Sequence, residues 1–273
     1  MVLESMMNPK NAEDKPLHIF AISVIYTFVC VYLANAMFPA QASMLAIALV
    51  TIVFVPFFQK LFELEEEKED RAARGQKNGN IFQRHWKSIK VFGVFFLGII
   101  AAMSFIFIFT DSSNIFQLQS ETLQGFSASV TGQATDTYGQ FTKFFFNNTQ
   151  VMLLVFMLSA AFGAGAVFIL VWNASVIAVY VGLIARTFAE NGLHSSVAYL
   201  FGVPVGLGTI ALHGVPEIAA YFLAGLGGGI LSVGVIKEKF GSREFNEIFF
   251  DALIFLVSAE LLIVIAAWIE AVF

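Results

Sequence analysis

The sequence predicts an all-α, polytopic membrane protein with about seven transmembrane helices. Of its 273 residues, 58% are hydrophobic and only 13% are charged, which is too apolar for an ordinary soluble domain. The hydrophobic residues also form long runs, and the charged residues gather between them. Nothing in this composition indicates nucleic-acid binding, and the single cysteine, Cys30, rules out an intrachain disulfide.

The first two apolar runs predict an N-terminal transmembrane hairpin, which we place at residues 1–58. They cover 17–38 and 41–58, and Pro39 and Ala40 separate them. A charged linker follows at 59–90 and holds eight of the fifteen Lys and Arg residues beside a run of acids. Its opposite charges three or four residues apart predict a solvated helix that needs no ligand. The positive-inside rule places this linker, and therefore the N-terminus, in the cytoplasm.

A core of five spans is predicted over residues 91–273. Its first span, 91–109, leads outward into a stretch at 110–148 that is rich in Ser, Thr and Gln and has Lys143 as its one basic residue. This stretch predicts an outer loop. An unbroken helix from 149 to 187 would be close to twice as long as the bilayer core is thick, at about 1.5 Å per residue. We therefore expect a span at 149–171, a broken helix near Trp172-Asn173, and a kinked interfacial helix inside.

Three further spans complete the predicted core. A Gly-Pro break at 214–216 separates the first two, because Gly214 weakens a helix and Pro216 favours the first helical position. Basic residues at 237–243 mark another cytoplasmic loop, so the C-terminus is expected outside. The three spans cover 196–212, 216–236 and 248–269.

Small residues in the sixth predicted span indicate close helix packing. They recur four residues apart in two sets, which lets neighbouring backbones approach. A phosphate-binding loop is disfavoured, because no strand precedes the glycines and no basic residue follows them before Lys237. The predicted packing residues are Ala220, Ala224, Gly225, Gly228 and Gly229.

A few polar residues interrupt the predicted spans. His213 lies just before the helix that Pro216 starts, and Glu217 lies in its first turn, where the positive end of the helix dipole favours a carboxylate. The predicted topology puts both in the outer half of the membrane. We expect one polar cluster there, with Glu260 nearest to mid-depth: Asn147, Asn148, His213, Glu217 and Glu260.

Three interpretations of this cluster remain open. Buried polar groups can hold helices together and satisfy a backbone break. A carboxylate and a His at a helix end inside the membrane can also form an ion or proton pathway. An intramembrane metallohydrolase is the third, although the His-Glu-x-x-His signature is absent. We therefore predict no catalytic residue, metal or cofactor, and an interfacial role for His85.

The stretch 144–235 resembles the stage II sporulation protein M family in its broad archaeal and bacterial form. The matching pieces are "FFFNN" at 144–148, "WNASVIAVYVG" at 172–182 and "LHGVPEIAAYFLAGLGGG" at 212–229. The last piece carries the family's His-Gly-x-x-Glu pattern on His213, Gly214 and Glu217. One departure is Ala174, where the family commonly has Gly. The resemblance covers the chain from Val91 on, and the N-terminal hairpin and linker look like an addition.

The resemblance implies a non-enzymatic scaffold or anchor for partners in envelope or membrane remodelling. An ion- or proton-coupled transporter that uses His213 and Glu217 is the alternative. We expect a multi-pass protein of the cell membrane that contacts the lipid bilayer and other membrane or envelope proteins, and no nucleic acid. Homo-oligomers are compatible with the small-residue stripe.

Overall fold

The chain folds as a helical bundle. The computed structural model describes residues 9–74, 79–110, 114–131 and 137–272, and within these ranges it contains helices and no strand. The all-α prediction is confirmed. The helices are α2 (Pro9–Asp14), α3 (Pro16–Met37), the 3-10 turn η1 (Pro39–Gln41), α4 (Ala42–Ala73), α5 (Ile81–Phe109), α6 (Gln117–Thr131), α7 (Thr137–Phe162), α8 (Ala166–Glu190), α9 (Ser195–Lys237) and α10 (Arg243–Val272).

Seven helices within the described residues are long and apolar enough to cross a membrane, namely α3, α4 with η1, α5, α7, α8, α9 and α10. Large apolar side chains such as Ile52, Phe162 and Trp268 remain exposed on their outer faces. Exposed apolar surface of this kind contacts lipid. The protein is therefore a multi-pass membrane protein, as the sequence predicts.

The N-terminal hairpin forms where the sequence places it, but its second helix is longer than the predicted span. Residues 59–73 of the charged stretch continue α4 without a break, and residues 81–90 form the beginning of α5. The side chains of Asn80 and Gln83 cap the start of α5 reciprocally. The polar stretch is thus built into the ends of two spanning helices.

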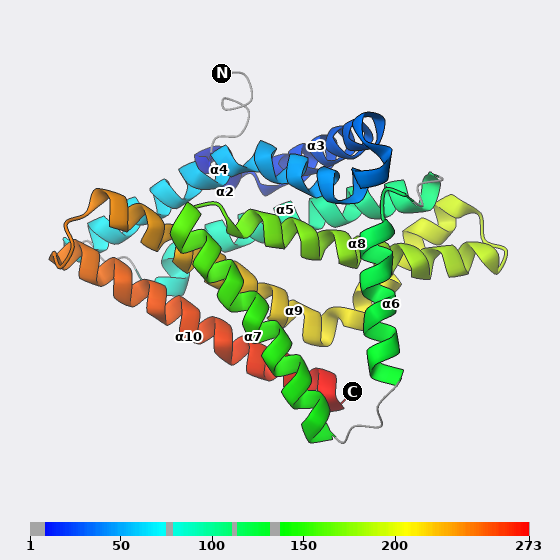
Figure 1. The fold of residues 1–273 in the computed structure, drawn as a ribbon. Helices are drawn as coiled ribbons and strands as arrows, with labels where there is room; N and C mark the ends of the chain where they lie inside the picture. Colours follow the sequence, from blue (N-terminus) through cyan, green and yellow to red (C-terminus); the bar gives the residue numbers. More distant parts are fainter. Residues whose placement is uncertain (1–8, 75–78, 111–113, 132–136, 273) are drawn as a thin grey trace.

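Residues 110–148 are not the predicted outer loop, because they contain α6 and the first turns of α7. Figure 1 shows α6 crossing α8 at a steep angle. The buried Gln119 of α6 accepts a 2.6 Å hydrogen bond from Ser43 of α4 and donates one of 3.1 Å to Ser175 of α8. These two bonds fasten α6 to the bundle.

The helix break predicted near Trp172-Asn173 is wrong, because the chain turns before these residues. The chain turns at 163–165, where Gly163 has φ +65°, a backbone conformation that glycine adopts without steric cost. Both Trp172 and Asn173 lie inside α8, and the Asn173 amide donates a 2.8 Å hydrogen bond to the carbonyl of Ile169 in its own helix. A complete spanning helix, α8, therefore replaces the predicted interfacial one.

The two spans predicted around Gly214 and Pro216 are one helix, α9, of 43 residues. The loss of the Pro216 N–H is absorbed without ending the helix, and the ribbon of α9 changes direction along its length (Figure 1). At about 1.5 Å per residue, α9 is about twice as long as the hydrocarbon core is thick. The predicted break is thus a bend within a continuous helix.

The predicted small residues all lie buried in the second half of α9. A Cβ added at Gly225 would lie 3.1 Å from the Cβ of Ala166, and one added at Gly228 would lie 2.5 Å from the carbonyl oxygen of Phe156. The backbone of α9 therefore approaches α7 and the start of α8 more closely than a side chain would allow. Ala220 and Ala224 are fully buried on the same half of α9.

Candidate functional site: a polar cavity between α7, α8 and α9

The course of α9 leaves a cavity in the bundle. Near its start, Gly202 and Gly206 pack directly against Ala185 and Val181 of α8. By Gly225, the helix packs instead against α7 and the beginning of α8. Between these two close approaches α9 bends, and a cavity of about 490 Å³ lies between α7, α8 and α9.

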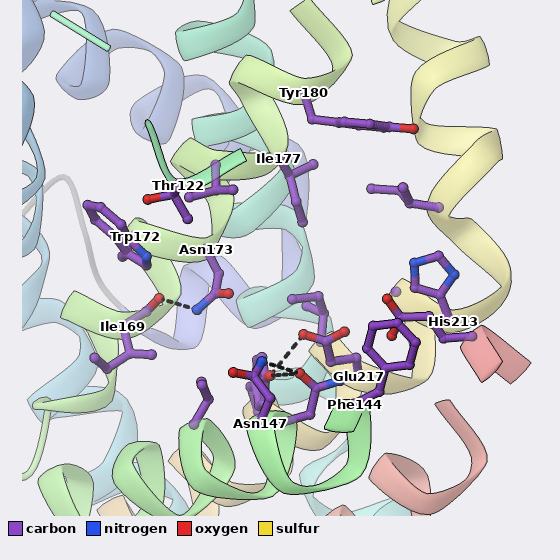
Figure 2. Close-up of a pocket in the computed structure, with 18 of the residues that line it drawn as sticks. Thr122, Phe144, Asn147, Ile169, Trp172, Asn173, Ile177, Tyr180, His213 and Glu217 are labelled. Atoms are coloured by element: carbon purple, nitrogen blue, oxygen red, sulfur yellow. Dashed lines mark hydrogen bonds between the residues drawn. The ribbon is translucent and has the colours of Figure 1, made fainter. Parts of the chain in front are cut away.

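The cavity is lined by side chains from five helices. Figure 2 shows Trp172, Asn173 and Tyr180 of α8 across the cavity from His213 of α9. The hydroxyl of Tyr180 lies 3.1 Å from that of Thr209 on α9, which ties the two walls together beside the cavity. The polar lining residues are Thr122, Asn147, Asn148, Asn173, Tyr180, His213, Glu217, Tyr221 and Glu270.

Glu217 is held by one hydrogen bond. The hydroxyl of Tyr221 donates to Glu217 Oε1 at 2.8 Å and lies 3.5 Å from Asn148 Oδ1. Asn147 in turn donates to Asn148 Oδ1 at 3.1 Å. Within the described part of the chain, Glu217 forms no salt bridge with Lys or Arg. Its carboxyl group is therefore oriented by neutral groups and carries no permanent counter-ion.

Glu270 is a second acid on the cavity that sequence reasoning missed. It lies near the end of α10 and lines the cavity with Glu217. The two carboxyl groups reach the cavity from different helices, α9 and α10. Among the residues that the structure describes, no Lys or Arg lines the cavity, and its two acids are Glu217 and Glu270. The imidazole of His213 has no hydrogen-bond partner among the described residues.

Four of the five predicted cluster residues line this cavity: Asn147, Asn148, His213 and Glu217. Glu260 does not. Its Oε1 accepts a 3.0 Å hydrogen bond from Thr149, and its Oε2 is buried without a partner among the described residues. Glu260 and Glu270 both lie on α10, ten residues apart, and Glu270 lines the cavity beside Glu217.

A second polar region lies at the other end of the bundle and was not predicted. Both ring nitrogens of the buried His85 contact carboxylates, Nδ1 that of Glu65 and Nε2 that of Glu69. Arg84 bridges Glu69 at 2.9 Å and Asp251 of α10 at 2.8 Å. The expected solvated helix is therefore wrong, because this face of α4 is buried, and the interfacial role of His85 stays a prediction. We call Glu65, Glu69, Arg84, His85 and Asp251 the ionic network.

Lys68 and Glu13 extend the ionic network to α2. The Lys68 ammonium lies 2.5 Å from Glu65 and 2.8 Å from Glu13. Nearby, but exposed, the Lys87 ammonium donates a 2.8 Å hydrogen bond to Asp14 and holds the pKa of that carboxyl below its ordinary value. Buried charges persist only when they are paired, and these pairs join α2, α4, α5 and α10.

The sequence does contain a signal for this network. Glu65 and Glu69 are four residues apart and thus share one face of α4, as Arg84 and Ser88 share one face of α5. Ser88 donates a 2.6 Å hydrogen bond to Glu65. Two facing polar stripes of this kind indicate paired helices, but a charged stripe on a single helix is equally typical of a solvated surface.

The two polar regions lie near opposite ends of α10. Asp251 of the ionic network and Glu270 of the cavity are separated by about 28 Å along the helix at about 1.5 Å per residue. This is close to the thickness of the hydrocarbon core, about 30 Å. Among the residues that the structure describes, no three His, Cys, Asp or Glu side chains are arranged to hold one metal ion.

The family described as Stage II sporulation protein M matches residues 17–273. The match begins at α3, so it includes the N-terminal hairpin in addition to the stretch from Val91 on which the sequence resemblance rests. No curated protein and no solved structure is significantly similar to the chain.

Proposed function

The chain belongs to the stage II sporulation protein M family, and we propose that it transports a cation through the cavity that contains Glu217. The observation that carries this proposal is the pair of acids, Glu217 and Glu270, on a cavity whose described lining residues include no Lys or Arg. A charge within a membrane costs several kcal/mol or more unless it has a partner or a function. Glu217 has a hydrogen bond from Tyr221 but no ion pair within the described residues.

The helix that carries Glu217 also has features of transport helices. Transporters commonly bind their substrate where a spanning helix is interrupted or bent. His213 and Glu217 flank Pro216 at the middle of α9, and both face the cavity. A change in the bend of α9 would alter the cavity without disturbing the close packing at Gly225 and Gly228.

A scaffold or anchor in envelope remodelling is the second candidate, and family membership favours it. In that function the cavity and the ionic network hold the helices in place, and partner proteins or further copies of the chain bind the exposed surface. The two candidates differ in one measurable property, since a scaffold carries no solute.

The proposed orientation places the N-terminus in the cytoplasm and the C-terminus outside. It follows from the positive-inside rule, because the ionic-network end of the bundle holds most of the Lys and Arg residues. The cavity end has Lys143 near the start of α7 and Arg186 near the end of α8. The cavity then lies toward the outer face of the membrane.

Flux through proteoliposomes tests the proposal. Purified protein is reconstituted, and uptake of protons, K⁺, Na⁺ and small ammonium compounds is compared for the wild type, Glu217→Gln and empty liposomes. Glu260→Gln is the matched control, because it removes a carboxylate of α10 outside the cavity lining. We expect uptake by the wild type and the control and loss of uptake in Glu217→Gln. No uptake above empty liposomes by the wild type would reject transport and favour the scaffold.

A further inference from the structure

We infer that the cavity binds an organic cation, with an ammonium group beside Glu217 and Glu270 and a carbon skeleton against the aromatic and aliphatic walls. The inference rests on the proposed function only for the location of the site. It concerns binding, which is measured without transport.

The electrostatics of the cavity determine the sign of the ligand's charge. Tyr221 donates to one oxygen of Glu217, and the other oxygen has no donor among the described residues. Glu270 adds a second carboxyl group to the lining. An anion would meet two carboxylates and no cationic side chain in the lining, whereas an ammonium donor would satisfy the open oxygen of Glu217.

The walls favour an organic cation over a bare metal ion. Aromatic rings line the cavity from three helices: Phe144 of α7, Trp172 and Tyr180 of α8, and Tyr221 of α9. The face of an aromatic ring attracts an ammonium group within about 6 Å of its centre, most strongly for Trp. A metal ion instead requires several converging ligands, and the described residues contain no group of three His, Cys, Asp or Glu side chains that could hold one.

The size and remaining lining support the same class of ligand. The volume of about 490 Å³ falls within the range of about 300–1,000 Å³ that is typical of small-molecule sites. Aliphatic side chains complete the lining, among them Val151, Ile169, Ile177, Ile210 and Ile218. An organic ammonium buries its carbon skeleton against such a surface, while a hydrated inorganic ion gains nothing from it.

Binding to the purified full-length protein tests the inference. Trp86 and Trp268 are replaced by Phe so that Trp172 alone reports on the cavity, and its emission is followed together with the heat of binding by titration calorimetry. The probe is choline, and its control is the uncharged analogue 3,3-dimethyl-1-butanol, in which a carbon replaces the ammonium nitrogen. We expect saturable binding of choline and affinity for the neutral analogue weaker by about tenfold or more.

Variants then connect binding to the carboxylates. Glu217→Gln should weaken choline binding by about tenfold, and Glu260→Gln should leave it unchanged. Glu270→Gln provides a second variant if Glu217→Gln fails to fold, as judged by gel filtration and helical circular dichroism. Equal affinity for choline and its neutral analogue, or no binding of either, would overturn the inference.

A membrane lipid could supply the same ammonium group, and a second arm of the experiment separates the two sources. Choline is titrated into nanodiscs that contain either phosphatidylethanolamine or phosphatidylglycerol. Weaker apparent binding in phosphatidylethanolamine supports occupation by the lipid ammonium, and equal binding in both supports a free organic cation. Choline binding without flux would support the binding site and reject transport. Flux of K⁺, Na⁺ or protons without choline binding would support transport and overturn the inference of an organic-cation site.

Discussion

The hydroxyl of Tyr221 reaches back one helical turn to hold Glu217 at 2.8 Å. Both side chains line the cavity, and the ring of Tyr221, only 1% exposed, also belongs to the packed core. The contact therefore fixes the position of the cavity carboxylate relative to the part of α9 that packs on α7.

Replacing Tyr221 by Phe should destabilise the protein by about 1–3 kcal/mol, because it removes the donor to Glu217 and keeps the ring. Thermal unfolding in detergent should show a lower Tm. Tyr138→Phe is the matched control, since Tyr138 is 76% exposed and its hydroxyl has no described hydrogen bond. Equal Tm values for the two variants would show that the Tyr221 hydroxyl contributes nothing to stability.

Loss of Arg84 should be among the most destabilising single changes in the chain. Arg84→Met leaves Glu69 and Asp251 without the guanidinium that bridges them, and breaking a buried ion pair costs about 3–5 kcal/mol. Arg74→Met removes the ion pair between Arg74 and Asp70. The side chain of Arg74 is 65% exposed, so the loss of this pair should destabilise the protein by less than about 1 kcal/mol. Comparable shifts in Tm for the two variants would contradict a structural role for the ionic network.

Replacing Gly228 by Ala should increase the distance between α9 and α7 and destabilise the protein. The new Cβ would lie 2.5 Å from the carbonyl oxygen of Phe156 and 2.8 Å from the Cβ of Ser159, so the backbone must move, at a cost of about 1–3 kcal/mol. Gly208→Ala, also in α9, meets no atom within 4 Å and should be neutral or slightly stabilising. A lower Tm only for Gly228→Ala supports the close helix contact, and unchanged stability would refute it.

The proposed orientation predicts which ends of α9 a membrane-impermeant maleimide can reach. In a Cys30→Ala background, Glu190→Cys before α9 should be labelled from outside intact cells. Lys239→Cys after α9 should be labelled only once the membrane is opened, because both side chains are exposed at opposite ends of the helix. The reverse labelling pattern would invert the proposed orientation.

The all-α class and the N-terminal hairpin could be predicted because long apolar runs leave few alternatives in a membrane. The location of the turn between α7 and α8 could not. Hydropathy is nearly uniform from α7 into α8, and the polar Asn173 marked a break that is absent, because its amide is satisfied by the carbonyl of Ile169 in its own helix. The turn occurs instead at Gly163, where the left-handed backbone conformation requires glycine.

The cavity was partly predictable for a related reason. The intramembrane polar residues His213 and Glu217 were identified individually, because each is costly in an apolar segment. Glu270 and the ionic network were missed because charged residues near helix ends look solvated in a sequence. Only the tertiary structure shows that Glu65 and His85 face each other across α4 and α5.

The contrast between α9 and α10 has a mechanical consequence. The 30 residues of α10 include neither Gly nor Pro, so no residue of this helix favours a kink between Asp251 and Glu270. The neighbouring α9 has two prolines and a glycine-rich second half, so it bends more easily than α10. A rigid-body shift of α10 at Asp251 would therefore also move Glu270, which lies about 28 Å away along the helix.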